Sequence, residues 1–325
     1  MTVIRSCAKV LAGACMVCQL ADVAQAQNYP VKTVRYIVPS SAGGGSDYMS
    51  RIVAEELGAT FGQQVVVENR AGAASNIGAE FVAKAPADGY TVLQVSQTLA
   101  VNANLYRNLP YDLMRDFAPV TLMVMQPYIV VVHASLPVKS IRELVKLAKS
   151  RPGAINYPSA GTGSASFFAQ EMFKSAAGVN LAHVPYKGGG PALIAVLSGE
   201  APVYFAPIPT AMPHIQQGRL RALAVSTAKR LPTLAQYPTV AESGVPGFEA
   251  VQWYGLAVPV KAPKEVVTTL HRATVALLAK PAVSKRLDEG GYVTVGNQPE
   301  EYTAFLRMEI ATLAKVIKQT GVTAE

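Results

Sequence analysis

Hydrophobic and polar positions along the chain switch repeatedly between the two-residue period of strands and the 3.6-residue period of helices. The β-branched and aromatic residues of 33–39 predict a strand, and apolar residues three and four apart over 47–57 predict a helix that Gly58 ends. Further strands are expected at 65–68, 90–96, 155–157, 182–185, 203–206, 220–226 and 253–259, and further helices at 77–85, 140–150, 164–177, 191–197, 212–217, 263–279 and 300–319. This order predicts an α/β protein with mixed sheets flanked by helices.

One long uncharged stretch needs a separate interpretation. It lies between Asp116 and Lys139 and contains Pro119, Pro127 and Pro137. A membrane helix needs about 20 uninterrupted apolar residues, so two β-rich segments fit this stretch better.

Composition sets the scale of the protein. The chain has 325 residues, of which 50% are hydrophobic and 15% are charged. A chain of this length allows about two domains, and its apolar content excludes a disordered or fibrous protein.

The N-terminus has the pattern of an export signal. Arg5 and Lys9 precede an apolar stretch over 10–20, and Ala24-Gln25-Ala26 supplies small residues for cleavage. We therefore expect residues 1–26 to be a secretory signal that is removed, which leaves an exported mature protein. Lipidation at Cys15 or Cys18 is the alternative, although neither follows the Leu-small-small pattern that it requires.

Cleavage would leave a chain without cysteine, because all three cysteines precede residue 27. The mature net charge would be +7, and 11 basic against 5 acidic residues in 127–249 supply most of it. These basic residues are scattered without interleaved aromatic residues, which argues against nucleic acid and favours steering of small anions.

A glycine-rich segment occurs twice, each time after a strand and before a helix. The residues Ser41, Ala42, Gly43, Gly44, Gly45 and Ser46 recur as Ser159, Ala160, Gly161, Thr162, Gly163 and Ser164. Backbone N–H groups of such turns, together with a helix N-terminus and hydroxyl donors, can bind an anion. The alternative is that these residues only form turns and helix caps.

Three other positions are weaker candidates. Ser96 and Gln97 follow a predicted strand, where they either contact a ligand or belong to a turn. Lys187, in a third glycine turn, either faces a carboxylate or is a solvated lysine.

Enzyme motifs are absent from the sequence. No Gly-x-Ser-x-Gly, Walker or dinucleotide-binding pattern occurs, and the four histidines have no metal-ligand spacing. Ser226 and Lys229 match Ser-x-x-Lys without its partner motifs, so we interpret the match as chance. We expect no catalytic residues, metal or cofactor.

Seven ordered motifs resemble those of the Bug proteins, the solute-binding receptors of the tripartite tricarboxylate transporter (TctC-like) family. They are Pro39-Ser-Ser-Ala-Gly-Gly-Gly-Ser-Asp47, Glu68-Asn-Arg-Ala-Gly72, Ala87-Asp-Gly-Tyr90, Leu109-Pro-Tyr-Asp112, His183-Val-Pro-Tyr-Lys-Gly188, Leu220-Arg-Ala-Leu-Ala-Val225 and Pro238-Thr-Val-Ala-Glu-Ser-Gly244. The resemblance spans the mature chain. It implies a two-lobed, type II-like periplasmic binding protein with a ligand cleft between α/β lobes.

The resemblance also implies how such a protein works. The lobes would comprise 27–126 plus 250–325 and 127–249, and they would close on a small organic acid anion held by the two glycine loops. We expect a monomer that delivers this ligand to integral membrane transporter subunits. A sensor ectodomain is an alternative partner, and a secreted hydrolase is an alternative function.

One departure from the family bears on the ligand. Many relatives resemble Phe-Asp-Asn where this chain has Phe205, Ala206 and Pro207. Ala206 cannot accept a hydrogen bond from a ligand amine, so an amino acid would bury an unpaired ammonium. We therefore expect an amine-free mono- or dicarboxylate, which an apolar or aromatic middle would also suit.

Overall fold

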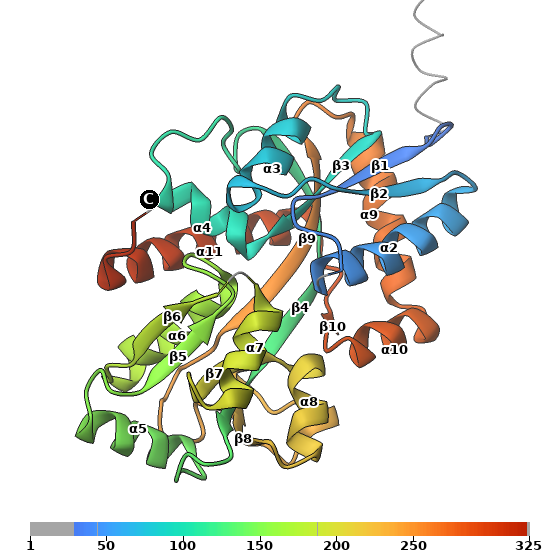
Figure 1. Cartoon of the computed structure of the whole chain (residues 1–325). Coiled ribbons are helices and arrows are strands. Elements are labelled where there is room, and N and C mark those ends of the chain that lie inside the picture. The colour runs from blue at the N-terminus through green and yellow to red at the C-terminus, as the bar shows by residue number, and fades with distance from the viewer. Residues whose placement is uncertain (1–28, 44, 187, 324–325) are drawn as a thin grey trace, which may run out of the picture.

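The computed structural model describes residues 29–43, 45–186 and 188–323, so Gly44, Lys187 and the predicted signal lie outside the described residues. Its largest element is an eight-stranded mixed sheet in the order β10-β4-β9-β3-β1-β2, with β7 and β8 paired to β4 (Figure 1). The strands are β1 Val34–Val38, β2 Val65–Asn69, β3 Thr91–Ser96, β4 Phe117–His133, β7 Val203–Pro207, β8 Leu220–Val225, β9 Val251–Pro259 and β10 Val293–Thr294. A second, parallel sheet contains β5 Asn156–Ser159 and β6 Ala182–Pro185.

Strand β4 connects the two halves of the molecule. It pairs antiparallel with β9 from Phe117 to Pro127, and then with β7 and β8 from Tyr128 to His133. The uncharged stretch is therefore one continuous strand of 17 residues rather than two β-rich segments. Its pairing partners change after Pro127, close to the lobe boundary at 126/127 that the family resemblance implies.

Helices cover both faces of the sheet in the first half. Tyr36 faces a core under α2, α9 and α10, whereas the next residue, Ile37, faces a core under α3, α4 and α11. Adjacent strand residues point to opposite faces, so a strand such as β1, which carries apolar residues on both faces, requires cover on both. These helices are α2 Gly45–Phe61, α3 Asn76–Ala83, α4 Gln97–Leu105, α9 Lys264–Leu278, α10 Pro281–Glu289 and α11 Pro299–Thr320.

The second half repeats this arrangement around the far end of β4. Val130 and Val132 pack under α5 and α6, whereas Ile129 and Val131 pack under α7 and α8. Its helices are α5 Ile141–Ser150, α6 Ala165–Ala177, α7 Gly189–Ser198 and α8 Ile208–Gln216. The predicted α/β class and mixed sheets are confirmed.

Several element boundaries differ from the predicted ones. Helix α2 continues through Gly58 to Phe61, so the predicted stop is wrong. A Cβ at Gly58 would lie 3.3 Å from the backbone oxygen of Gln63, and this close approach gives the glycine another role. Helix α10 was not predicted, because only Val283 and Leu287 are buried in it. No helix among the described residues is long and apolar enough to cross a membrane.

Ser226 joins the two segments that connect the halves. Its hydroxyl accepts from the Tyr128 backbone N–H at 2.9 Å and donates to the Ala250 carbonyl at 2.5 Å. Its backbone also pairs with both residues. Ser226 is fully buried. Its role is therefore structural, because its hydrogen bonds join the segment that enters β9 to the middle of β4.

Candidate functional site

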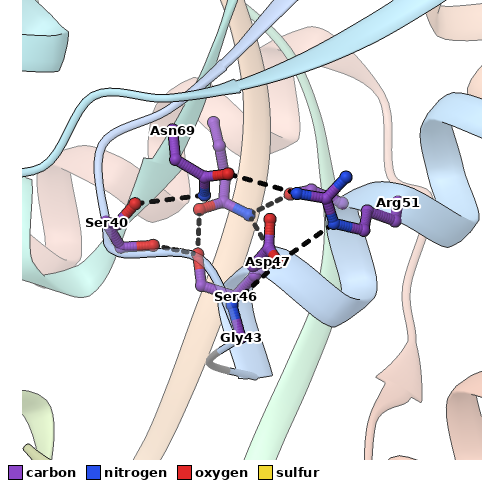
Figure 2. Close-up of polar contacts among 8 residues, drawn as sticks. Ser40, Gly43, Ser46, Asp47, Arg51 and Asn69 are labelled. Carbon is purple, nitrogen blue, oxygen red and sulfur yellow. Dashed lines mark hydrogen bonds and ion pairs between the residues drawn. The ribbon is translucent and has the colours of Figure 1, made fainter.

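The first glycine loop, residues 41–46, follows the carboxyl end of β1 and leads into α2. Asp47 lies in the first turn of α2 and is 4% exposed. Its Oδ2 accepts from the Gly43 backbone N–H at 2.9 Å and from Arg51 Nε at 3.0 Å (Figure 2). Burial raises the pKa of Asp47, but the bonds from Arg51 and Gly43 outweigh it and hold the pKa below its usual value. An ionised carboxylate therefore fixes the turn, in which Gly43 has a φ of +82°.

Hydroxyl and amide groups tie this loop to the sheet. Ser40 donates to the Ser46 hydroxyl at 3.1 Å, and Ser46 donates to Gln94 of β3. Asn69 Nδ2 donates to the Ser40 carbonyl at 3.1 Å, so β2 also supports the loop (Figure 2). Gln94 is a buried amide between the apolar residues Leu93 and Val95, and this mismatch is the sequence signal that could have identified it.

The start of α2 also contacts residues near the change of partners in β4. A Cβ at Gly45 would lie 2.7 Å from Tyr292 Oη and within 4 Å of the Gln126 side-chain amide. Tyr292 and Gln126 are both buried. Gly45 therefore allows the loop to lie directly against Tyr292 and Gln126, and no local sequence pattern indicates these contacts.

The second glycine loop, residues 159–164, begins at the carboxyl end of β5 and leads into α6. Ser159 is fully buried, and its hydroxyl lies 2.7 Å from His183 Nε2 and accepts from the Gly161 N–H at 3.1 Å. Ser166 accepts from the Ala160 N–H at 3.1 Å, and Ser164 caps α6 by accepting from Phe167 N–H. Thr162 is exposed at the tip.

The structure places the other candidate residues in different settings. Ser96 is buried and precedes α4. Gln97 is the first residue of α4, and its Oε1 has no hydrogen-bond partner among the described residues. Ala206 is fully buried in the core under α7 and α8, and Pro207 is half-buried before α8. Ser41 and Ala42 are exposed, as are Gly43 and Gly45, while Ser46, Gly163 and Ser164 are half-buried.

Both loops border the same segment of the first half. Ser46 bonds to Gln94 on β3, and Gly163 lies beside Leu105, with 3.7 Å between its Cβ position and Leu105 Cδ2. Leu105 ends α4, the helix that follows β3. Each loop lies at the carboxyl end of parallel strands, the edge at which open α/β sheets bind ligands.

Comparison with known proteins supplies the family. The model of the tripartite tricarboxylate transporter family receptor matches residues 49–322. The chain belongs to this receptor family. It is 34% identical to protein BugT of Bordetella pertussis over 298 residues, which cover 91% of each chain. The resemblance to the Bug proteins is thereby confirmed.

Two solved structures of proteins from Rhodopseudomonas palustris share the fold. Rpa4515, solved with adipate, is 36% identical with a TM-score of 0.83, and the match covers 91% of this chain and 99% of that one. MatC, solved with bound malate, is 29% identical with a TM-score of 0.78, and the match covers 89% and 100%. The two-lobed α/β fold expected from the family is confirmed.

Proposed function

We propose that this receptor is a monomeric periplasmic protein that captures a small organic carboxylate between its lobes and delivers it to a tripartite transporter. The observation that carries the proposal is the pair of glycine loops. Each opens a helix of at least 13 residues at the carboxyl end of parallel strands. Adipate and malate in the two relatives support a carboxylate ligand.

The chemistry of capture follows from backbone groups. Helix N-termini carry unpaired N–H groups and a partial positive charge, so they bind a carboxylate without a cationic side chain. In the first loop the Asp47 carboxylate is paired with Arg51, which compensates its charge next to an incoming anion. The ligand would bridge the two loops as the lobes close, and closure would exclude water.

The change of partners along β4 supports the proposed lobe boundaries. Strand β9 begins at Val251, and the partners of β4 change after Pro127. These positions lie within two residues of the boundaries 126/127 and 249/250. Lobe closure would bend β4 and the segment before β9, which Ser226 holds together.

The proposed ligand lacks an amine because position 206 offers no acceptor. Ala206 is fully buried, and Pro207 lacks a side-chain acceptor as well. Calorimetry with aspartate and with succinate, which differ only by the amine, tests this part of the proposal. Succinate should bind at least tenfold more tightly, and tighter binding of aspartate would contradict an amine-free ligand.

A thermal-shift screen tests the function itself. The panel contains mono-, di- and tricarboxylates, including adipate, malate and benzoate, with adipamide as the uncharged control for adipate. A ligand present at 100 times its Kd stabilises the folded state by about 2.7 kcal/mol. An acid should therefore raise the melting temperature by several degrees while its amide does not. A panel without any stabilising acid would contradict the proposal.

Delivery to a transporter needs a separate measurement. The purified receptor is crosslinked to membranes that contain the transporter subunits, with and without the acid found in the screen. Ligand-dependent crosslinks to those subunits are expected. Crosslinks to a sensor ectodomain instead would overturn this part of the proposal and leave carboxylate capture intact.

A further inference from the structure

His183 lies directly behind the second glycine loop. It belongs to β6, and its Nε2 is 2.7 Å from the Ser159 hydroxyl on the neighbouring strand β5. Its ring is stacked on Tyr157, with centroids 5.0 Å apart, and lies 4.7 Å from the ring of Phe167. The imidazole is therefore held in one orientation between β5 and α6.

The hydrogen bonds of Ser159 indicate which group donates. Its hydroxyl accepts from the Gly161 N–H, and it lies 3.0 Å from the Gly161 carbonyl, to which it can donate. A hydroxyl has one proton and two lone pairs. If His183 donates its Nε2–H, the two lone pairs of the Ser159 hydroxyl accept from His183 and from the Gly161 N–H. The hydroxyl proton then remains available for the Gly161 carbonyl. We assign this tautomer because it satisfies all three groups at once.

This network acts on the part of the loop that would meet the ligand. Gly161 has a φ of +123°, and its carbonyl also accepts from the Ser164 N–H at 3.1 Å. Ser164 in turn caps α6. A fixed Gly161 peptide therefore fixes the turn through Thr162 and the direction of the α6 N-terminus.

The charged groups around His183 come from α6. Burial and Lys174 lower the pKa of His183, and Glu171 partly opposes them. Glu171 itself bonds to the Tyr157 hydroxyl and forms an ion pair with Lys174 at 2.7 Å. The neutral imidazole is thus the form that fits this environment at neutral pH.

We propose that His183 is a positioning residue for ligand binding, which donates to Ser159 and thereby holds the 159–164 loop in its binding conformation. This inference rests on the proposed function of the loop. Ser159 is fully buried, so the Ser159–His183 pair cannot present a nucleophile to a substrate. Its role is to shape the loop.

The first experiment compares His183→Gln, which keeps a donor near the Nε2 position, with His183→Leu, which removes it. His271→Leu is the matched control, because His271 is also half-buried and hydrogen-bonded but belongs to α9. Adipate is the probe ligand, and calorimetry measures its affinity for each protein. Loss of one buried hydrogen bond predicts an affinity about tenfold weaker for His183→Leu. His183→Gln and His271→Leu should remain within about threefold of wild type.

Nitrogen NMR of the imidazole provides a readout that packing alone would not produce. In the ligand-free protein at pH 7.5 the His183 ring should carry its proton on Nε2, the nitrogen that faces the Ser159 hydroxyl. A proton on Nδ1 alone would overturn the proposal, because Nε2 would then accept from the hydroxyl. Equal loss of affinity in His183→Gln and His183→Leu would also overturn it, because a donor would then be irrelevant.

Amide hydrogen exchange in the ligand-free protein separates this inference from the proposed function. His183→Leu should speed exchange at 160–166, and His183→Gln should not. If wild type bound no carboxylate, the proposed function would fail, and exchange would still decide whether His183 holds the loop. Unchanged exchange in His183→Leu would refute that role.

Discussion

The two glycine loops share five of six residues, yet the structure builds them differently. Helix α2 begins at Gly45, inside the first copy, whereas α6 begins at Ala165, after the second copy ends. Ser46 therefore lies within the first turn of α2 and donates to Gln94, while its counterpart Ser164 caps α6. The shared residues give both loops the same groups for anion binding, but they do not determine the same local conformation.

The supporting groups differ as well. An ionised carboxylate, Asp47, holds the first loop, and Arg51 compensates its charge. The second loop is held by hydroxyls and a neutral imidazole, through Ser159, Ser166 and His183. The first support depends on charge and the second on the direction of hydroxyl protons. The loops should therefore respond differently to substitution and to acid.

A negative charge introduced into either loop should cause the largest loss of ligand affinity, and the loss should be equal for the two loops. Ala42 and Thr162 are exposed positions of the two loops, so Ala42→Asp and Thr162→Asp should leave the fold intact. Each places a carboxylate near a helix N-terminus and should weaken binding of the acid found in the thermal-shift screen at least about 100-fold by repulsion. Ala42→Asn and Thr162→Asn are the uncharged controls. Calorimetry at low salt is the measurement, and a loss confined to one loop would show that the ligand is not held from both sides.

The supports should differ in strength. Asp47→Asn removes the charge from buried hydrogen bonds to Gly43 and Arg51, and we expect the free energy of unfolding to fall by about 2 kcal/mol. Ser164→Ala removes a helix cap and should cost about 1 kcal/mol. Urea unfolding of both variants measures the difference. A larger loss for Ser164→Ala would reverse the assigned order.

Sequence patterns predicted the elements well where one signal dominated. The predicted helix 140–150 begins as expected, with Ser140 accepting from the Glu143 N–H, although the Glu143 carboxylate accepts from the Lys139 N–H and so completes no capping box. The predicted helix 300–319 is α11, which ends at Gly321 with a φ of 67°. Helix α2 passes Gly58 because tertiary contacts override a weak stop signal. Gln126 and Pro127 interrupt the apolar stretch where the partners of β4 change, but the identity of the partner strands could not be predicted, because local residues do not reveal which distant strands will pair with them.

The loops themselves were predictable and their supports were not. Glycine, serine and a following helix are local signals, so 41–46 and 159–164 could be recognised from sequence. Gln94, Tyr292 and His183 lie far from these loops in sequence, and only the fold brings them together. Gln94 and His183 belong to strands β3 and β6, and Tyr292 directly precedes β10. A contact set by strand order cannot be inferred from local spacing.

Glycine replacement should separate close packing from backbone strain. Gly45→Ala would place a Cβ 2.7 Å from the buried Tyr292 hydroxyl, and the resulting overpacking should cost about 1.5 kcal/mol. Gly163→Ala meets only Leu105 at 3.7 Å, but its φ of +80° should cost about 1 kcal/mol. Tyr292→Phe should restore most of the stability to Gly45→Ala and none to Gly163→Ala. Urea unfolding of the two double variants checks this, and restoration of both would show that Tyr292 acts through overall stability.

Mild acid should produce the smallest effect and should reach the second loop first. The lowered pKa of His183 means that the unfolded chain binds more protons than the folded one just below pH 6.5, so stability falls as the pH decreases there. The loss is a fraction of the ~1.4 kcal/mol per pH unit that one full proton gives. Asp47 has its pKa below 3.8, so its contribution is retained until lower pH. Unfolding free energies between pH 7.5 and 5 should decline less in His183→Gln than in wild type, and as much in Asp47→Asn as in wild type. A steeper decline in His183→Gln would mean that the folded protein stabilises the imidazolium, the opposite of what its setting between Tyr157 and Phe167 implies.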